Sequence, residues 1–398
     1  MGFDVKKNVV ITMAGKMLIL LANFLAVVLS TRLWGAEGKG IITMFVADVS
    51  LLAIVSNVFV GSSASYHISR GTNKLFTMAL TWALIVPLLG ATLFRFAEEE
   101  TLSFAFFLAT SLLSVYAFFN SLYIGEQRIA QYNLLTVLQP VLLIVFLLLF
   151  YYFVDDSCNA YIYAMIASYG ILNLYSLWKK RGRYTDSYSW DWQLFRETFV
   201  FGLQNELSNF LQFFNARLSY YFLNYYAGTA SVGVYSIGVT ISEALWVVSR
   251  SFSTVQYSRL LKEKNDRRAV ESTKAMAQYC GIITLGMLLV MNLMPETLFV
   301  WVFGAEFAAV KQVLLIMSPG IFTVSLSYIF DHYFTAKGKL RILMVKSLAG
   351  VAVTVVCSIF LIRKYQMNGA VWVNLLSNLV TSSVLIFAFL YEVKKEKN

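Results

Sequence analysis

Long apolar runs recur along the whole chain and alternate with short polar connections. A helix needs about 20 mostly apolar residues to cross a bilayer. Runs of that length predict twelve transmembrane helices, which begin near Val9, Ile41, Leu75, Leu102, Leu134, Tyr161, Thr198, Val232, Ala275, Ala308, Leu343 and Ala370. The first run is too long for a removable signal peptide and lacks a cleavage site, so we expect it to be the first helix of the mature protein.

The composition agrees with a membrane protein, because 58% of the 398 residues are hydrophobic and only 14% are charged. The only cysteines and histidines are Cys158, Cys280, Cys357, His67 and His332. They lie far apart in the sequence, so neither a disulfide framework nor a metal-ligand cluster is expected. Catalysis is not expected either, because no long loop carries the paired carboxylates that a membrane glycosyltransferase or ligase would need.

The net charge of +10 reflects topology. If successive connections alternate sides, 24 of the 32 Lys and Arg residues fall on the side of the two termini, six fall on the other side, and Lys16 and Arg217 lie inside helices. Basic residues are retained on the cytoplasmic side of a membrane. Both termini are therefore predicted to be cytoplasmic, and nucleic-acid binding is not expected.

Two long cytoplasmic connections are predicted, at residues 179–197 and 249–274. The first separates two six-helix halves, and its Trp190, Trp192 and Phe195 predict a short interfacial helix. The predicted domains are therefore an N-terminal half at 1–178, a linker at 179–197 and a C-terminal half at 198–398.

The two halves show traces of an internal repeat. An offset of 193 residues places "WGAEGKGIITM" on "AGTASVGVYSI", which matches Gly35 with Gly228 and Gly40 with Gly233. The motifs "GEQR" and "GKLR" follow the fourth helix of each half. A duplicated unit with six helices keeps its orientation in the membrane, as in transporters built from parallel repeats. The predicted fold class is thus an all-α integral membrane protein with two parallel-repeat six-helix bundles around a central cavity.

The segments "LSTRLWGAEGKGIITMFVADVSLL" and "YYAGTASVGVYSIGVTISEALW" resemble the polysaccharide-exporter, or oligosaccharide repeat-unit flippase, family. Its superfamily also includes lipid II flippases and multidrug/cation antiporters. The resemblance implies that an undecaprenyl-diphosphate-linked oligosaccharide moves from the cytoplasmic to the outer leaflet of a bacterial inner membrane, for O-antigen, capsule or exopolysaccharide assembly. Relatives are expected to carry an acidic residue two positions after the arginine of helix 7, where this chain has Ser219.

Ionisable residues inside predicted spans are costly and usually face a cavity or a partner. The candidates are Lys16, Asp48, Glu206, Arg217 and Glu243. At 100° per residue, one face of helix 7 gathers the amides and hydroxyls of Asn205, Ser208, Asn209, Gln212 and Ser219, which suits a hydroxyl-rich cargo or interhelical hydrogen bonds. Asp48 lies near the outer end of helix 2, where interfacial solvation also accounts for it.

The predicted depths of these charged residues in the membrane match in two pairs. Arg217 and Glu243 lie at similar depths from the outer side, and Lys16 and Glu206 lie at similar depths from the cytoplasmic side. Two interpretations follow. In the first, Arg217 and Lys16 bind a diphosphate, with Asn23, Asn205, Asn209 and Gln212 as further substrate ligands. In the second, Arg217 with Glu243 and Lys16 with Glu206 form ion pairs that position helices, and Asp48 joins Glu243 and Glu206 as a gating or ion-pair residue.

The leading hypothesis is a lipid-linked oligosaccharide flippase that works by alternating access. It needs no cofactor beyond a coupling proton or Na⁺, and its expected partners are membrane lipids, a polysaccharide polymerase and a chain-length regulator, with the protein itself a monomer. The alternative is an ion-coupled multidrug or small-molecule antiporter of the same superfamily, although the first helix offers no carboxylate for the ion. A major-facilitator transporter is not favoured, because "SASYHISRGTNK" lacks the glycine-aspartate-arginine turn of that class.

Overall fold

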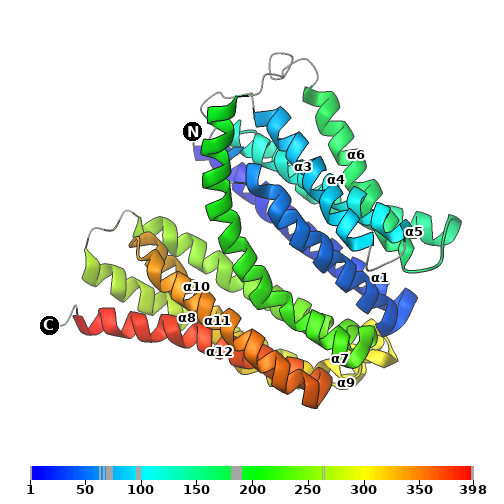
Figure 1. Ribbon diagram of the computed structural model, residues 1–398. Helices are drawn as coiled ribbons and strands as arrows, with labels where there is room; N and C mark the ends of the chain where they lie inside the picture. Colours follow the sequence, from blue (N-terminus) through cyan, green and yellow to red (C-terminus); the bar gives the residue numbers. More distant parts are fainter. Residues whose placement is uncertain are drawn as a thin grey trace. The chain divides into compact units, whose positions relative to one another are not determined.

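A computed structural model describes residues 2–61, 64–65, 68, 75–95, 100–180, 191–261, 263 and 265–395, with the side chains of 2–14, 94–95, 100–101, 205, 208, 340 and 395 outside the description. Figure 1 shows the helices, and no strand occurs in the described ranges. The elements are α1 (Gly2–Ser56), η1 (Asn57–Phe59), α3 (Leu75–Arg95), α4 (Glu100–Gly125), α5 (Ile129–Phe153), α6 (Asn159–Lys180), α7 (Trp192–Leu260), α8 (Asp266–Leu293), α9 (Glu296–Phe303), η2 (Ala305–Phe307), α10 (Val310–Ala336), α11 (Leu340–Cys357), η3 (Ser358–Ile362) and α12 (Arg363–Lys395).

Three of these helices contain a sharp break. The backbone leaves helical geometry at Gly35 in α1 (φ 61°), at Gly228 in α7 (φ 80°) and at Gln366 in α12 (φ 50°). Glycine adopts a positive φ without steric penalty, which explains why two of the breaks fall at glycines. In the described residues, eight helical segments are long and apolar enough to cross a membrane, and they include spans of 45, 52 and 54 residues that run through these breaks. The protein is therefore a multi-pass membrane protein.

The chain divides into two compact units whose boundaries fall inside helices. Unit 1 comprises Met1–Trp34 and Ile41–Phe210, and unit 2 comprises Gly35–Gly40 and Leu211–Asn398. The first part of α7 therefore belongs to unit 1, whereas six residues of α1 belong to unit 2.

Apolar clusters hold unit 1 together. One gathers buried aromatic residues of η1, α3 and α4, among them Phe59, Phe118 and Tyr123. Another joins α1 with α4, α5 and α6, through residues such as Phe45 and Phe106. Water is absent from a bilayer core, so packing of this kind, rather than a hydrophobic driving force, holds the helices together.

The first turns of α7 pack on the cluster of η1, α3 and α4. Phe195 contacts Phe59 with ring centroids 5.0 Å apart, and a Cβ on Gly202 would lie 1.8 Å from the carbonyl oxygen of Val58. Trp192 and Phe195, which the sequence placed on a separate interfacial helix, thus form the beginning of the continuous helix α7. Trp190 lies outside the described residues.

Unit 2 contains a reciprocal crossing of two glycine segments. A Cβ on Gly40 would lie 1.9 Å from the carbonyl oxygen of Thr229, and a Cβ on Gly233 would lie 2.0 Å from that of Ala36. These are the segments that the sequence offset matched, and both glycines allow backbones to approach where any side chain would collide. The duplication of whole six-helix halves stays a prediction.

The turns after α4 and α10 are similar, but not in the register that the sequence motifs gave. A left-handed residue stands at Gln127 (φ 57°) in the first turn and at Gly338 (φ 67°) in the second. In each turn the next amide reaches back five residues, from Arg128 to Tyr123 (2.8 Å) and from Lys339 to Phe334 (2.9 Å). This is the Schellman pattern of a helix end. Gln127, and not the glycine of "GEQR", therefore corresponds to Gly338.

Candidate functional site

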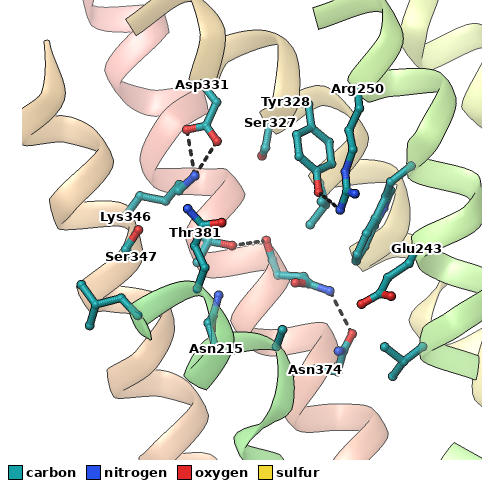
Figure 2. Close-up of a pocket in the computed structure, with 17 residues that line it drawn as sticks. Asn215, Glu243, Arg250, Ser327, Tyr328, Asp331, Lys346, Ser347, Asn374 and Thr381 are labelled. Atoms are coloured by element: carbon teal, nitrogen blue, oxygen red, sulfur yellow. Dashed lines mark hydrogen bonds and ion pairs between the residues drawn. The ribbon is translucent and has the colours of Figure 1, made fainter. Parts of the chain in front are cut away.

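Unit 2 contains a polar cavity of about 240 Å³ within an apolar helical bundle (Figure 2). It is lined by 17 residues from α7, α10, α11 and α12. Four of them are charged: Glu243, Arg250, Asp331 and Lys346. A second group consists of the amides Gln212, Asn215, Asn374 and Asn378. Polar groups concentrated in this way inside a membrane-spanning unit are expensive and indicate a functional site.

Asp331 of α10 and Lys346 of α11 neutralise each other across one wall. The Lys346 ammonium donates to both carboxylate oxygens of Asp331, at 2.8 and 2.6 Å. Figure 2 shows both bonds. Both side chains are about four-fifths buried, so each charge depends on the other for compensation.

Arg250 of α7 has a neutral partner instead. Its Nη2 donates to the Tyr328 hydroxyl at 2.8 Å, and its guanidinium lies 5.1 Å from the centre of that ring. Trp246 packs edge-on against Tyr328, with centroids 6.4 Å apart, and fixes the ring. Within the described residues Arg250 forms no ion pair, so most of its five N–H donors are available to an anion.

The amide side of the cavity is a fixed hydrogen-bond network. Asn215 Oδ1 accepts from Ser377 Oγ at 2.8 Å and from Thr354 Oγ1 at 3.0 Å. Gly350 leaves room for it, because a Cβ there would lie 2.9 Å from Asn215 Nδ2. On α12, Asn378 Nδ2 donates to Asn374 Oδ1 at 2.9 Å. These contacts hold the amides in place, and amides both donate to and accept from hydroxyl groups.

Arg217 stands behind the cavity wall. Its Nη2 donates to Glu243 Oε1 at 2.8 Å and its Nη1 donates to the Tyr220 hydroxyl at 2.6 Å. The pairing that matched depths predicted for Arg217 and Glu243 is therefore present. Glu243 lines the cavity, whereas Arg217 does not.

Lys39 is a further cation close to Arg217. It belongs to the six residues of α1 in unit 2, its side chain is buried, and the positive charge of Arg217 acts on it. It forms no hydrogen bond or ion pair with another described residue. The charge count places Lys39 at an outer helix end, four residues after the break at Gly35, but the sequence does not reveal that this short segment packs inside unit 2.

The other sequence candidates lie in unit 1. Glu206 is buried and accepts from Asn209 Nδ2 at 3.0 Å. Lys16 and Asn23 are exposed on α1, and Asp48 is half-buried. The side chain of Asn205 lies outside the described residues.

The expected ion pair between Lys16 and Glu206 is not formed. The Lys16 side chain is exposed, whereas the Glu206 carboxylate is buried and bonded to Asn209. Equal depth in the membrane therefore did not bring these two side chains together.

Sequence reasoning missed Arg250, Asp331 and Lys346 as site residues. Arg250 was assigned to the long connection at 249–274, but α7 continues to Leu260. Lys346 was counted with the connection after the tenth helix, yet it lies about two turns inside α11. Asp331 was identifiable as an acidic residue in an otherwise apolar run.

Solved structures share this fold. An inward-facing multidrug resistance transporter of the MATE family, in the MOP superfamily, aligns with a TM-score of 0.74 at 15% identity over 97% of each chain. The lipid II flippase MurJ in an inward closed conformation aligns with a TM-score of 0.73 at 10% identity, over 96% of this chain and 87% of MurJ. The MATE multidrug transporter DinF-BH aligns with a TM-score of 0.67 at 16% identity, over 96% of this chain and 94% of DinF-BH.

The sequence comparison identifies the family. No protein of curated function matches the chain in sequence. A profile of the family described as "Polysaccharide biosynthesis protein" matches residues 5–260. Because this match spans more than half of the chain, the protein belongs to the polysaccharide biosynthesis protein family.

Proposed function

We propose that the protein is a flippase that moves an undecaprenyl-diphosphate-linked oligosaccharide repeat unit from the cytoplasmic to the outer leaflet by alternating access. The product would serve O-antigen, capsule or exopolysaccharide assembly. Family membership supports the glycan, and the fold shared with MurJ and MATE transporters supports a transport step.

One observation carries the proposal: Arg250, which pairs with no carboxylate of the described residues, lies beside a fixed amide network inside a membrane-spanning unit. The planar fork of Arg250 suits a phosphate, which it can bind through two parallel hydrogen bonds. Asn374 and Asn378 can exchange hydrogen bonds with sugar hydroxyls. The cavity thus offers a group for each half of a sugar-diphosphate head.

The residues selected from the sequence keep secondary roles in this proposal. Gln212 adds an amide to the cavity wall. Arg217 holds Glu243 in one state and could exchange that carboxylate for a diphosphate in another. Lys16, Asn23, Asn205 and Asn209 would contact substrate along the unit 1 part of its path.

We also propose twelve spans with both termini in the cytoplasm of a bacterial cell. Three of the eight long apolar segments break at Gly35, Gly228 and Gln366, and each would cross the membrane twice. The less apolar helix α6 supplies the twelfth span. The distribution of Lys and Arg supports this orientation in an inner membrane. A monomer that meets a polymerase and a chain-length regulator in the membrane fits the same role.

Reconstitution tests the function. Proteoliposomes would carry a fluorescent polyprenyl-diphosphate oligosaccharide, and a membrane-impermeant quencher would report how much of it reaches each leaflet. We expect faster exchange between leaflets with protein than in empty vesicles, and slower exchange with Arg250→Gln. Equal rates with and without protein would contradict the proposal.

An ion-coupled drug antiporter is the second candidate. The observation that favours it is the pair of carboxylates, Glu243 and Asp331, that line the same cavity and could bind a coupling proton or Na⁺. Uptake of a cationic dye driven by a proton or Na⁺ gradient, without movement of the lipid-linked glycan, would support this candidate.

A further inference from the structure

Unit 2 contains a second pocket of about 570 Å³, lined by residues of α10, η3 and α12. It lies on a different face of α12 from the polar cavity. Asn368, Trp372 and Leu376, spaced four residues apart, line the pocket, whereas Asn374 and Asn378 line the cavity. Residues four apart share one helix face, so α12 separates the two sites. The volume is typical of pockets that bind small molecules.

The wall of this pocket is built from irregular backbone. Ser358–Ile362 form a π-helix, and Gln366 adopts a positive φ of 50°, which is uncommon for a residue other than glycine. A Cβ on Gly369 would lie 2.1 Å from the carbonyl oxygen of Leu361, so the irregular segment is packed tightly against α12. Departures of this kind cost free energy and concentrate at functional sites.

The lining combines aromatic rings with free amides. Trp372 is 45% exposed and Tyr365 is 50% exposed, so both present ring surface to the pocket. The amides of Gln312 and Asn368 are exposed and form no hydrogen bond within the part of the chain that the structure describes. The pocket has no charged residue in its wall. Apolar ring faces beside unpaired amides match a neutral sugar, which has a C–H face and a rim of hydroxyls.

The position of the pocket relates it to the direction of transport. Gln312 and Ile316 lie in the first turns of α10, at the opposite end of that helix from the turn at Gly338. The predicted orientation places that turn in the cytoplasm. The pocket then lies toward the outer side of the membrane, beyond the polar cavity.

We infer that this pocket binds an uncharged sugar residue of the transported glycan on the release side. The inference rests on the proposed function, because it identifies the pocket ligand as part of the cargo. Trp372 would stack on the sugar face, and Asn368 and Gln312 would bind its hydroxyls.

Saturation-transfer NMR on the full-length protein in nanodiscs tests the inference, with free glucose, galactose, rhamnose and N-acetylglucosamine as probes. We expect transfer to at least one sugar, reduced about threefold or more in Trp372→Leu and in Asn368→Leu. Trp301→Leu is the matched control, because Trp301 lies in α9, is 72% exposed and does not line the pocket. No transfer in the wild type, or equal transfer in all variants, would overturn the inference.

A second measurement separates sugar binding from lipid contact. Aromatic residues also gather where a membrane meets water. The fluorescence of Trp372 is the difference between the wild type and Trp372→Leu. If brominated phospholipids quench this fluorescence and the sugars do not reduce the quenching, lipid occupies the pocket and the inference fails.

The flippase assay distinguishes failure of the inference from failure of the proposed function. If the wild type exchanges the glycan between leaflets but the sugar signals are the same in Trp372→Leu, the inferred sugar site is wrong and the proposed flippase function stands. If the sugar signals depend on Trp372 but the wild type does not exchange the glycan, the pocket binds carbohydrate and the proposed flippase function is wrong.

Discussion

Helix α7 carries two arginines in contrasting surroundings. Arg217 donates to Glu243 and to the Tyr220 hydroxyl. Arg250 lies beyond the break at Gly228, and among the described residues it donates only to the Tyr328 hydroxyl and rests on that ring. Both contacts to tyrosine are alike, with a ring distance of 5.2 Å for Arg217 and 5.1 Å for Arg250. The carboxylate is the difference.

That difference separates a structural charge from an available one. A paired arginine satisfies its neighbour, and removal of either member leaves an uncompensated charge. An arginine with a neutral partner keeps its full charge for a ligand. We therefore expect substitutions at Arg217 to act first on stability, and substitutions at Arg250 to act first on binding and transport.

The largest effect is expected from Arg250→Gln. A charge-assisted hydrogen bond to a phosphate contributes up to about 3 kcal/mol, so the affinity for a polyprenyl-diphosphate oligosaccharide should fall by about a hundredfold. Transport in proteoliposomes should fall with it, at unchanged thermal stability. Arg259→Gln is the control, because Arg259 is exposed in the last turn of α7 and does not line the cavity. An equal loss of affinity in both variants would show that any positive charge near this end of α7 contributes to binding, and not Arg250 in particular.

Arg217→Met should act on folding. Glu243 would lose its ion pair, and since the two side chains are 27% and 35% exposed, solvent screens part of the cost. We expect a loss of about 1–2 kcal/mol in the free energy of unfolding. Glu243→Gln in the same chain should restore most of it, because no unpaired carboxylate is left. Thermal unfolding in detergent compares the wild type with both variants, and a double variant no more stable than Arg217→Met would assign the loss to packing.

The same two arginines show how far the sequence predicts this site. Arg217 and Glu243 flank the break at Gly228, and helices joined by a tight turn must be neighbours, so equal depth was enough to predict their contact. Lys16 and Glu206 also match in depth, but they lie on helices far apart in the sequence. Depth fixes a position along the membrane normal and leaves the direction around each helix open, so their contact could not be derived.

The ends of the helices were the second feature that the sequence did not predict. The hydrophobic pattern located the membrane segments, yet it ended the eighth helix before Arg250, since "SRSFSTVQYSRL" is polar. The structure continues α7 through this stretch to Leu260, which places Arg250 in the cavity wall. Polar residues that face a cavity look like a loop when only hydropathy is read.

Asp331→Asn would convert a paired cation of the cavity into a second available one. Lys346 donates to both oxygens of Asp331, and the substitution removes the negative charge while it keeps the shape. We expect the diphosphate head to bind about threefold more tightly, with a steeper dependence on salt. Binding isotherms at two ionic strengths measure this, and adding Lys346→Met should cancel the gain. Weaker binding in Asp331→Asn would mean that the ion pair itself positions the substrate.

Tyr328→Phe should have the smallest effect and tests what the neutral partner contributes. The variant loses the acceptor at 2.8 Å but keeps the ring under the guanidinium. Arg250 is exposed, so water can replace the lost hydrogen bond at little cost, and we expect affinity for the diphosphate head to fall by about twofold or less. Tyr328→Leu also removes the ring, and should weaken binding further because the guanidinium loses the surface that orients it. If Tyr328→Phe and Tyr328→Leu weaken binding equally, the hydroxyl rather than the ring positions Arg250. The Tyr328 hydroxyl would then hold Arg250 in the same way as the Tyr220 hydroxyl holds Arg217.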